Sequence, residues 1–375
     1  TKVQFVEGVE WVPPPSEHPL PAALRQAVKL AKVPVFAPTF DADFRRDLEM
    51  LSGAKPLDAP GPGSFAGARL LRKNSADPRH QLDLLVDYLE ARYKKLGLQT
   101  RRQRIVWRGI PQSNLVAIIP GRATAPAAAP AANSGANSSA NSGANSSGPK
   151  LPIALVDHID TAFCEDLFAR SEQRISAPGA DDNASSTAAL LRAAEALRTV
   201  PQEARQHDIW LVHLTGEEFP ADDLGARHFI ADLLHSRTDL GALLLLDMIG
   251  HNPRHRPEYQ LNTGGYYEAG GVSMRLGQLS ALITPRVAPA LRPMIYPPTD
   301  LRSYLYNTDG LLFAEAGFPV VHFSEVMNRY LLSRSGYHDS ADTIATVNVP
   351  HAAGITRVAI ATAALLSQVG IPSAQ

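Results

Sequence analysis

Short apolar segments alternate with helical patterns along most of this chain. The apolar segments are rich in Leu, Val and Ile and stop at polar or turn-forming residues, which is typical of strands buried on both faces of a parallel sheet. We expect strands at residues 115–119, 153–156, 209–214, 243–246 and 320–323. Because helical patterns separate these segments, the sequence predicts an α/β fold: a three-layer α/β/α sandwich with a mixed, mostly parallel central sheet.

The helical segments show apolar residues at helical spacing together with residues that start or stop a helix. The firmest has Asp77 as N-cap and Pro78 in its first turn, and it ends at Gly97. We expect further helices at residues 40–51, 184–197, 225–234 and 352–366. These helices would cover the faces of the sheet.

Two segments have compositions that do not suit a packed core. Residues 1–40 are Pro-rich and are expected to form an extended N-terminal arm. Residues 122–149 consist almost entirely of Ala, Pro, Asn, Ser and Gly and are expected to be a disordered loop between two strands. The rest of the chain, residues 41–375, is expected to be one catalytic domain.

Charge and cysteine content exclude several classes of function. The formal net charge of -1 leaves no basic excess for nucleic acid or anionic lipid. Cys164 is the only cysteine, so a metal would have to bind to His, Asp and Glu. The apolar runs fall short of the roughly 20 residues that a membrane span needs, and no span is expected. Because the chain begins at Thr1 rather than Met, we expect that a segment has been removed and that the protein is secreted or periplasmic.

Histidines and carboxylates follow several of the expected strands, at the sheet edge where open α/β folds place their active sites. His158 follows the strand at 153–156, and Asp160 lies two residues further on. Asp160 could accept one imidazole N–H and leave the other nitrogen of His158 free for a metal. A His-x-Asp sequence alone is weak evidence for a metal site.

Pairs of adjacent carboxylates recur at two later positions. Asp181 and Asp182 precede an Ala-rich helix, which one of them could cap, leaving Asp182 as a candidate to bridge two cations. Glu217 and Glu218 follow an apolar strand, so one could bind metal while the other takes a proton from metal-bound water. In isolation such a pair would be a solvated acidic turn.

The last two candidate ligands lie further along the chain. Asp247 follows four consecutive leucines, where burying its charge is costly unless a cation compensates it. His338 lies in a loop before the last expected helix and offers a late imidazole, although alone it would be an ordinary surface histidine. The sequence therefore favours metal ligation at Asp247 more strongly than at His338.

In chain order these residues resemble the motifs of family twenty-eight of the metallopeptidases, the bacterial di-zinc aminopeptidases. The matching segments are His158-Ile159-Asp160, Gly179-Ala180-Asp181-Asp182-Asn183-Ala184-Ser185, Glu217-Glu218, Asp247-Met248 and Tyr337-His338. The similarity extends from about residue 40 to the C-terminus. The resemblance implies a zinc exopeptidase fold, two Zn²⁺ ions, and hydrolysis of the first peptide bond of peptides that have a free N-terminus.

The resemblance also implies a role for each residue. The implied metal ligands are His158 and Asp247 for one zinc, Glu218 and His338 for the other, and Asp182 as the bridge between them. Glu217 would be the general base that acts with a zinc-bound hydroxide. Asp160 would contact a metal ligand without binding the metal itself. The peptide bond between Asp182 and Asn183 would be cis.

Two departures from the family pattern affect substrate specificity rather than chemistry. Ser186 stands where the family usually has Gly, and the acidic loop at 219–224 is longer than usual. Candidates for pocket walls are Phe219, Met248 and Phe323, and candidates for hydrogen bonds to the reaction intermediate are Tyr304, Tyr306 and Tyr337. Core packing or an ordinary structural hydroxyl is the alternative role for each.

Other functions fit the same fold. A glutaminyl cyclase resembles a single-zinc version of the site, and the presence of ligands for both metals argues against it. A non-catalytic binding domain would tend to lose ligands or the base, whereas this chain keeps them. Carboxypeptidase or dipeptidase action is also compatible. The sequence leaves the oligomeric state, the physiological metal and the preferred N-terminal residue open.

Overall fold

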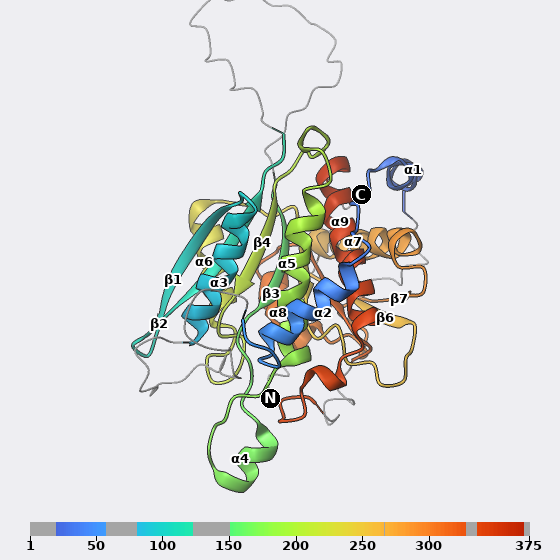
Figure 1. Cartoon of the computed structure of the whole chain (residues 1–375). Coiled ribbons are helices and arrows are strands. Elements are labelled where there is room, and N and C mark those ends of the chain that lie inside the picture. The colour runs from blue at the N-terminus through green and yellow to red at the C-terminus, as the bar shows by residue number, and fades with distance from the viewer. Residues whose placement is uncertain (1–19, 58–80, 123–150, 266, 328–335, 371–375) are drawn as a thin grey trace, which may run out of the picture.

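One eight-stranded sheet forms the centre of the molecule (Figure 1). The structure is a computed structural model that describes residues 20–57, 81–122, 151–265, 267–327 and 336–370. The strands are β1 (Gln99–Trp107), β2 (Ile110–Ile119), β3 (Ile153–His158), β4 (Ile209–Leu214), β5 (Ala242–Leu246), β6 (Glu258–Gly264), β7 (Arg292–Tyr296) and β8 (Val320–Ser324). Their order across the sheet is β1-β2-β4-β3-β5-β8-β6-β7.

The four central strands, β4, β3, β5 and β8, run parallel to one another. On one side β2 and β1 continue the sheet with antiparallel pairings. On the other side β6 is antiparallel to β8 and parallel to β7. Parallel neighbours need crossover connections, which helices usually provide. This sheet confirms the predicted α/β fold with a mixed, mostly parallel sheet.

Helices cover both faces of the sheet, which makes three layers (Figure 1). The helices are α1 (Ala22–Leu30), α2 (Phe40–Leu51), α3 (Gln81–Lys95), α4 (Glu165–Ser171), α5 (Ser185–Leu197), α6 (Leu224–Ser236), α7 (Tyr267–Val287), α8 (Asp309–Glu315) and α9 (Val349–Val369). The larger layer contains α2, α3, α5, α7 and α9. The smaller layer contains α6 and α8. Helix α4 belongs to neither and projects from the body at the bottom of Figure 1.

The central strands are apolar throughout because both of their faces are buried. In β3, Ile153 and Leu155 pack in the core of the larger helical layer, whereas Ala154 and Val156 pack in the core of the smaller one. The leucines of β5 divide between the two cores in the same way. Fully burying one such side chain stabilises a fold by about 1.5–3 kcal/mol. The apolar runs that predicted strands are therefore the runs that fix the centre of the sheet.

The structure contains all five expected strands as β2, β3, β4, β5 and β8, and α2 has the expected bounds. Three strands were missed because they lack an apolar run. The edge strand β1 is rich in arginine and mostly exposed. In β6, Gln260 and Asn262 are polar yet buried. Strand β7 is short and only partly buried, with the sequence Arg-Pro-Met-Ile-Tyr.

The N-terminal region differs from the expected extended arm, because residues 22–30 form the helix α1. Val28 is buried, and α1 contacts α7 and α9. A helix of nine residues is too short to be stable alone, and packing against two longer helices stabilises it. Residues 1–19 and 123–150, which include about half of the predicted arm and almost all of the predicted loop, lie outside the described residues, as do Asp77 and Pro78.

One described helix, α9, is long and apolar enough to cross a membrane by length and composition alone. Its most apolar window has a mean hydropathy of 1.4, and 83% of that window is buried inside the fold. Helix α9 contacts α5, α7 and β3. A helix buried between other elements in this way is typical of a protein core.

Candidate metal centre

The five predicted ligands lie at the edge of the sheet where the parallel strands end. His158 is the last residue of β3, and Asp247 directly follows β5. Glu218 lies beyond the end of β4, and Asp182 lies in an irregular turn before α5. His338 comes from the loop that precedes α9. Because parallel strands end at the same edge, the topology gathers residues that are far apart in the sequence.

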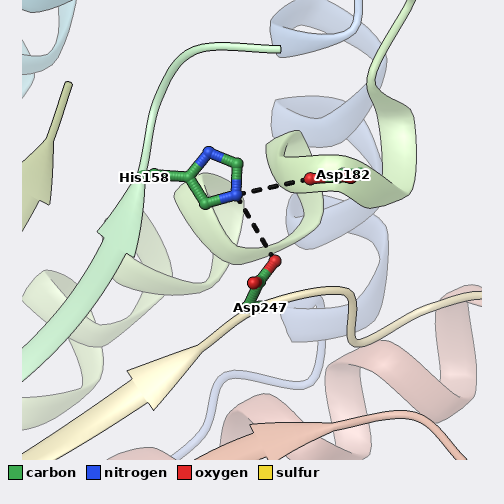
Figure 2. Close-up of side chains that lie close together, drawn as sticks. All are labelled: His158, Asp182 and Asp247. Atoms are coloured by element: carbon green, nitrogen blue, oxygen red, sulfur yellow. Dashed lines mark ion pairs between the residues drawn. The ribbon is translucent and has the colours of Figure 1, made fainter. Parts of the chain in front are cut away.

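His158, Asp182 and Asp247 form the first group of possible metal ligands (Figure 2). The Nε2 atom of His158 lies 3.3 Å from Oδ1 of Asp182 and 3.4 Å from Oδ1 of Asp247. All three side chains are buried. Two atoms that each lie about 2.1 Å from one tetrahedral zinc ion are about 3.4 Å apart. The spacing of this group therefore suits zinc.

Asp182, Glu218 and His338 form the second group. The Nε2 atom of His338 lies 3.3 Å from Oδ2 of Asp182 and 3.4 Å from Oε2 of Glu218. Asp182 thus belongs to both groups and directs a different carboxylate oxygen to each. A carboxylate placed in this way can bridge two cations.

Several polar atoms of the two groups lack the partners that burial normally requires. Oδ1 of Asp247 and Oε1 of Glu218 are buried and have no hydrogen bond to any described residue. Burying a carboxylate oxygen without a donor or a cation costs free energy. Imidazole and carboxylate without thiolate is also a donor set that zinc uses at catalytic sites. The residues present therefore fit two zinc ions.

The centre gathers more carboxylates than positive charges. Burial raises the pKa of Asp247 to about 6, although His158 opposes this shift. Burial also raises the pKa of Glu218, and it raises the pKa of Glu217 well above its ordinary value. Burial would lower the pKa of His338, but Glu218 and the other nearby carboxylates raise it overall. Divalent cations would neutralise this excess of negative charge.

Asp160 is fully buried behind the two glutamates. Its Oδ1 accepts a hydrogen bond from the backbone N–H of Glu217 at 3.1 Å, and its Oδ2 accepts one from that of Glu218 at 3.0 Å. Its Oδ1 is 3.6 Å from Nδ1 of His158, which is too far for a hydrogen bond. The structure therefore places Asp160 as an anchor of the glutamate pair, whereas the sequence predicted a hydrogen bond to the imidazole.

A sequence comparison identifies the family of this chain. Residues 141–363, more than half of the chain, match Peptidase family M28. The chain belongs to peptidase family M28. The match confirms the family that the motifs predicted and supports a metal-dependent peptidase. No curated protein sequence matches this chain.

Solved structures with the same fold include peptidases and a cyclase. The Legionella pneumophila LapA aminopeptidase matches with a TM-score of 0.60 and 14% identity over 92% of this chain and 75% of its own. A Zn-dependent exopeptidase from Parabacteroides distasonis matches with a TM-score of 0.57 and 14% identity over 88% and 98%. The Fimbriiglobus ruber glutaminyl cyclase matches with a TM-score of 0.56 and 16% identity, also over 88% and 98%. At such low identity these likenesses show the shared fold.

Asp342 is a site residue of this M28 chain for which the sequence predicted no role. Its two carboxylate oxygens accept hydrogen bonds from the backbone N–H groups of Asp181 at 2.8 Å and of Asp182 at 3.1 Å. The Oδ1 atom of Asp181 in turn accepts a hydrogen bond from the N–H of Gly250. These bonds hold the turn that carries Asp182, whose peptide bond to Asn183 is cis. The only signal in the sequence was that Asp342 follows His338 by four residues, after the first carboxylate at Asp339.

Asp309, at the start of α8, is a second buried carboxyl group that sequence reasoning missed. Neither of its side-chain oxygens has a hydrogen bond to a described residue. Burial, together with the negative charges of Asp223, Asp160 and Asp247, raises the pKa of Asp309 well above its ordinary value. The Thr-Asp-Gly sequence here resembles an ordinary helix start, so nothing in it indicated a position near the metal centre.

The predicted tyrosines lie in a small aromatic cluster beside the centre. Tyr304 packs with Met248 and Met327. Its hydroxyl donates to that of Tyr337 at 3.1 Å, and the ring of Tyr337 stacks on His338 with 3.9 Å between ring centres. The cluster thus forms one wall next to a predicted ligand.

The three predicted pocket residues have different environments. Met248 belongs to this cluster, whereas Phe323 is fully buried in the main core. Phe219, which directly follows Glu218, is 58% exposed. Core packing therefore accounts for Phe323 but not for Phe219.

Proposed function

We propose that this chain is a di-zinc aminopeptidase that hydrolyses the first peptide bond of peptides. The observation that carries the proposal is the position of Asp182, whose two carboxylate oxygens lie beside His158 and His338 respectively. A bridging carboxylate between two complete ligand groups is characteristic of two-metal hydrolases. Membership of the M28 family and the shared fold with an aminopeptidase support the same function.

Each ion would have its own ligands in addition to Asp182. His158 and Asp247 would hold one ion, and Glu218 and His338 would hold the other. When bound, the ions would lower the pKa of water and polarise the scissile carbonyl group. The remaining chemistry falls to side chains of this protein.

Glu217 is the group that we assign to proton transfer. Its backbone is fixed by Asp160, and its side chain is partly buried next to Glu218. From this position it takes a proton from the attacking water and passes it to the amino group that leaves.

Glutaminyl cyclase is the second candidate function, because an enzyme of that kind shares the fold. It would convert an N-terminal glutamine to pyroglutamate with release of ammonia, without water attacking a peptide bond. The complete second group of ligands favours the peptidase. The two functions give different products from one peptide that begins with glutamine.

The test combines zinc analysis with a small set of substrates. We expect two zinc ions per chain, cleavage of leucine p-nitroanilide, and no cleavage of its N-acetylated form. A peptide that begins with glutamine should lose that residue. Equal cleavage of the acetylated substrate would exclude an aminopeptidase, and a peptide that loses only ammonia would identify a cyclase.

A further inference from the structure

Helix α4 is carried by a hairpin-shaped segment, residues 162–177, called here the α4 hairpin. Its two ends pair with each other: the N–H of Cys164 donates to the carbonyl oxygen of Ile175 at 2.7 Å, and that of Ala177 to Ala162 at 2.9 Å. In Figure 1 α4 lies at the bottom of the view, beyond the body that contains the sheet. The hairpin follows directly on β3, which ends at His158.

The α4 hairpin is attached to the loop that carries His338. The N–H of Glu165 donates to the carbonyl oxygen of His338 at 2.8 Å, and Oε1 of Glu165 lies 3.4 Å from Nδ1 of the same residue. The side chain of Asp166 accepts hydrogen bonds from the N–H and hydroxyl of Ser340 at 2.9 and 2.7 Å. The hairpin therefore has a fixed position beside one of the proposed ligands.

His338 marks the side from which solvent reaches the metal centre. Its side chain is 19% exposed, whereas those of His158, Asp182, Glu218 and Asp247 are 2 to 7% exposed. His338 is thus the most exposed of the five ligands, and we take its side of the centre as the exit for the rest of a bound peptide. The α4 hairpin is attached beside His338 and borders this exit.

Arg174 presents a positive charge at this exit. Its guanidinium carbon lies 5.4 Å from the ring centre of Phe163 in the same hairpin and 5.3 Å from that of Phe219. Phe219 directly follows the proposed ligand Glu218, so Arg174 reaches the loop of the metal centre itself. Arg174 is exposed, and no carboxylate of the described part of the chain pairs with it.

Contacts with aromatic rings leave the binding capacity of a guanidinium group intact. The attraction of a guanidinium group to an aromatic ring does not use up its N–H donors, which remain available in the plane of the group. Those donors match the two oxygens of a carboxylate. The rings also restrict the side chain, so less entropy is lost when a ligand binds.

We propose that Arg174 binds a carboxylate of the substrate on the C-terminal side of the scissile bond. The enzyme then prefers peptides in which the residue after the released one is acidic, or in which that residue carries the free C-terminal carboxylate. The proposal rests on the aminopeptidase function above and adds a substrate class to it. An exposed arginine that only packs on phenylalanine rings would give no such preference.

The test uses four leucyl peptides that separate the two sources of a carboxylate. Leu-Glu-Ala-amide is compared with Leu-Gln-Ala-amide for the side chain, and Leu-Ala with Leu-Ala-amide for the C-terminus. The measured quantity is the ratio of kcat/KM within each pair, for wild type, Arg174→Gln and Arg174→Lys. Arg170→Gln, which removes an exposed arginine of α4 without ring contacts, is the matched control.

We expect wild type to prefer the carboxylate in at least one pair by about tenfold, as for a charge-assisted bidentate contact near the surface. Arg174→Gln should abolish this preference, Arg174→Lys should retain part of it, and Arg170→Gln should leave it unchanged. The preference should also weaken in 0.5 M salt, where the Debye length is about 4 Å, compared with about 30 Å at 0.01 M. The pair that responds identifies the source of the carboxylate.

Two results would overturn the proposal in distinguishable ways. If wild type cleaves all four peptides but shows no preference, or keeps its preference in Arg174→Gln, Arg174 is not a substrate-binding residue and the aminopeptidase function stands. If wild type cleaves none of the four and no p-nitroanilide of any other amino acid, the aminopeptidase function itself fails and the inference fails with it.

Discussion

Buried charges occur in two regions of this protein, and they are balanced in only one of them. In the larger helical layer, the fully buried Asp47 of α2 forms ion pairs with Arg92 of α3 at 3.1 Å and with Arg192 of α5 at 2.6 Å. Each oxygen of Asp47 thus has its own guanidinium group. At the metal centre, by contrast, the carboxylates outnumber the imidazoles, and none of Asp182, Glu218 and Asp247 forms an ion pair with an arginine or lysine of the described residues.

Hydrogen bonding differs between the two regions in the same way. Between α3 and the sheet, the hydroxyl of Tyr93 lies 2.6 Å from Nε2 of His213, and Nδ1 of His213 lies 2.6 Å from Oδ1 of Asp157. At the metal centre the closest imidazole–carboxylate distances are 3.3 to 3.4 Å. The first spacing is that of direct hydrogen bonds, and the second leaves room for an ion between the atoms. Buried carboxylates therefore indicate a functional site here where no arginine or lysine balances their charge and where the spacing leaves room for an ion.

Asp182→Ala should have the largest effect, because it removes the one side chain shared by both ligand groups. We expect the zinc content to fall below two ions per chain and kcat/KM to fall by at least about 10⁴-fold, since water activation and proton transfer both depend on the ions. Elemental analysis and hydrolysis of leucine p-nitroanilide measure these changes. Asp239→Ala removes an exposed carboxylate as a control. If the Asp182→Ala protein stays active and keeps two zinc ions, Asp182 does not bridge the ions. The contrast between the metal centre and the region of Asp47 would then have no functional meaning.

Glu217→Gln should separate proton transfer from metal binding within the centre. The amide keeps the shape of the side chain but cannot accept the proton, so kcat should fall by about 10³-fold. The zinc content should stay at the wild-type value, because Glu217 belongs to neither ligand group. Loss of zinc in this variant would instead make Glu217 a ligand.

Asp47→Ala should affect stability rather than catalysis. It leaves the buried Arg192 with only the half-exposed Glu195 as a partner, and breaking a buried ion pair in this way costs about 3 kcal/mol in the free energy of unfolding. Urea denaturation measures this loss, and the folded protein should bind zinc as wild type does. Asp41→Ala is the control on the same helix, because its ion pair with Arg357 is partly exposed and should contribute less than about 1 kcal/mol. Equal losses of stability in the two variants would show that burial does not make the ion pairs of Asp47 stronger than the partly exposed pair of Asp41.

Tyr93→Phe should have the smallest effect, a loss of about 1–3 kcal/mol in stability, because it leaves Nε2 of His213 without its partner. Tyr259→Phe, which removes a buried hydroxyl bonded to Thr284, is the matched control. The zinc dissociation constant should not change in either variant. A weaker zinc affinity in Tyr93→Phe alone would mean that this chain of hydrogen bonds helps to position His158, the neighbour of Asp157.

The sequence predicted the centre of the fold better than it predicted the periphery, and the candidate ligands that it named lie together at one edge of the sheet. Runs of apolar residues mark β3, β4 and β5 because both faces of these strands are buried, and the metal-binding motifs come directly after them. The same rule overlooks β1, whose side chains are mostly exposed, and β6, whose buried side chains are largely polar. Asp342 and Asp309 were overlooked because only contacts across the fold show their relation to the centre.

The sequence by itself determined the α/β class, the absence of thiolate ligands and the order of the candidate ligands along the chain, because these follow from residue types and their local spacing. The tertiary structure decided which oxygen of Asp182 lies beside which histidine and that Asp160 holds the glutamate backbone. It also decided that Arg174 lies over two aromatic rings at the edge of the site. Such relations depend on how strands and loops from distant parts of the chain are placed in space, which the local pattern does not contain.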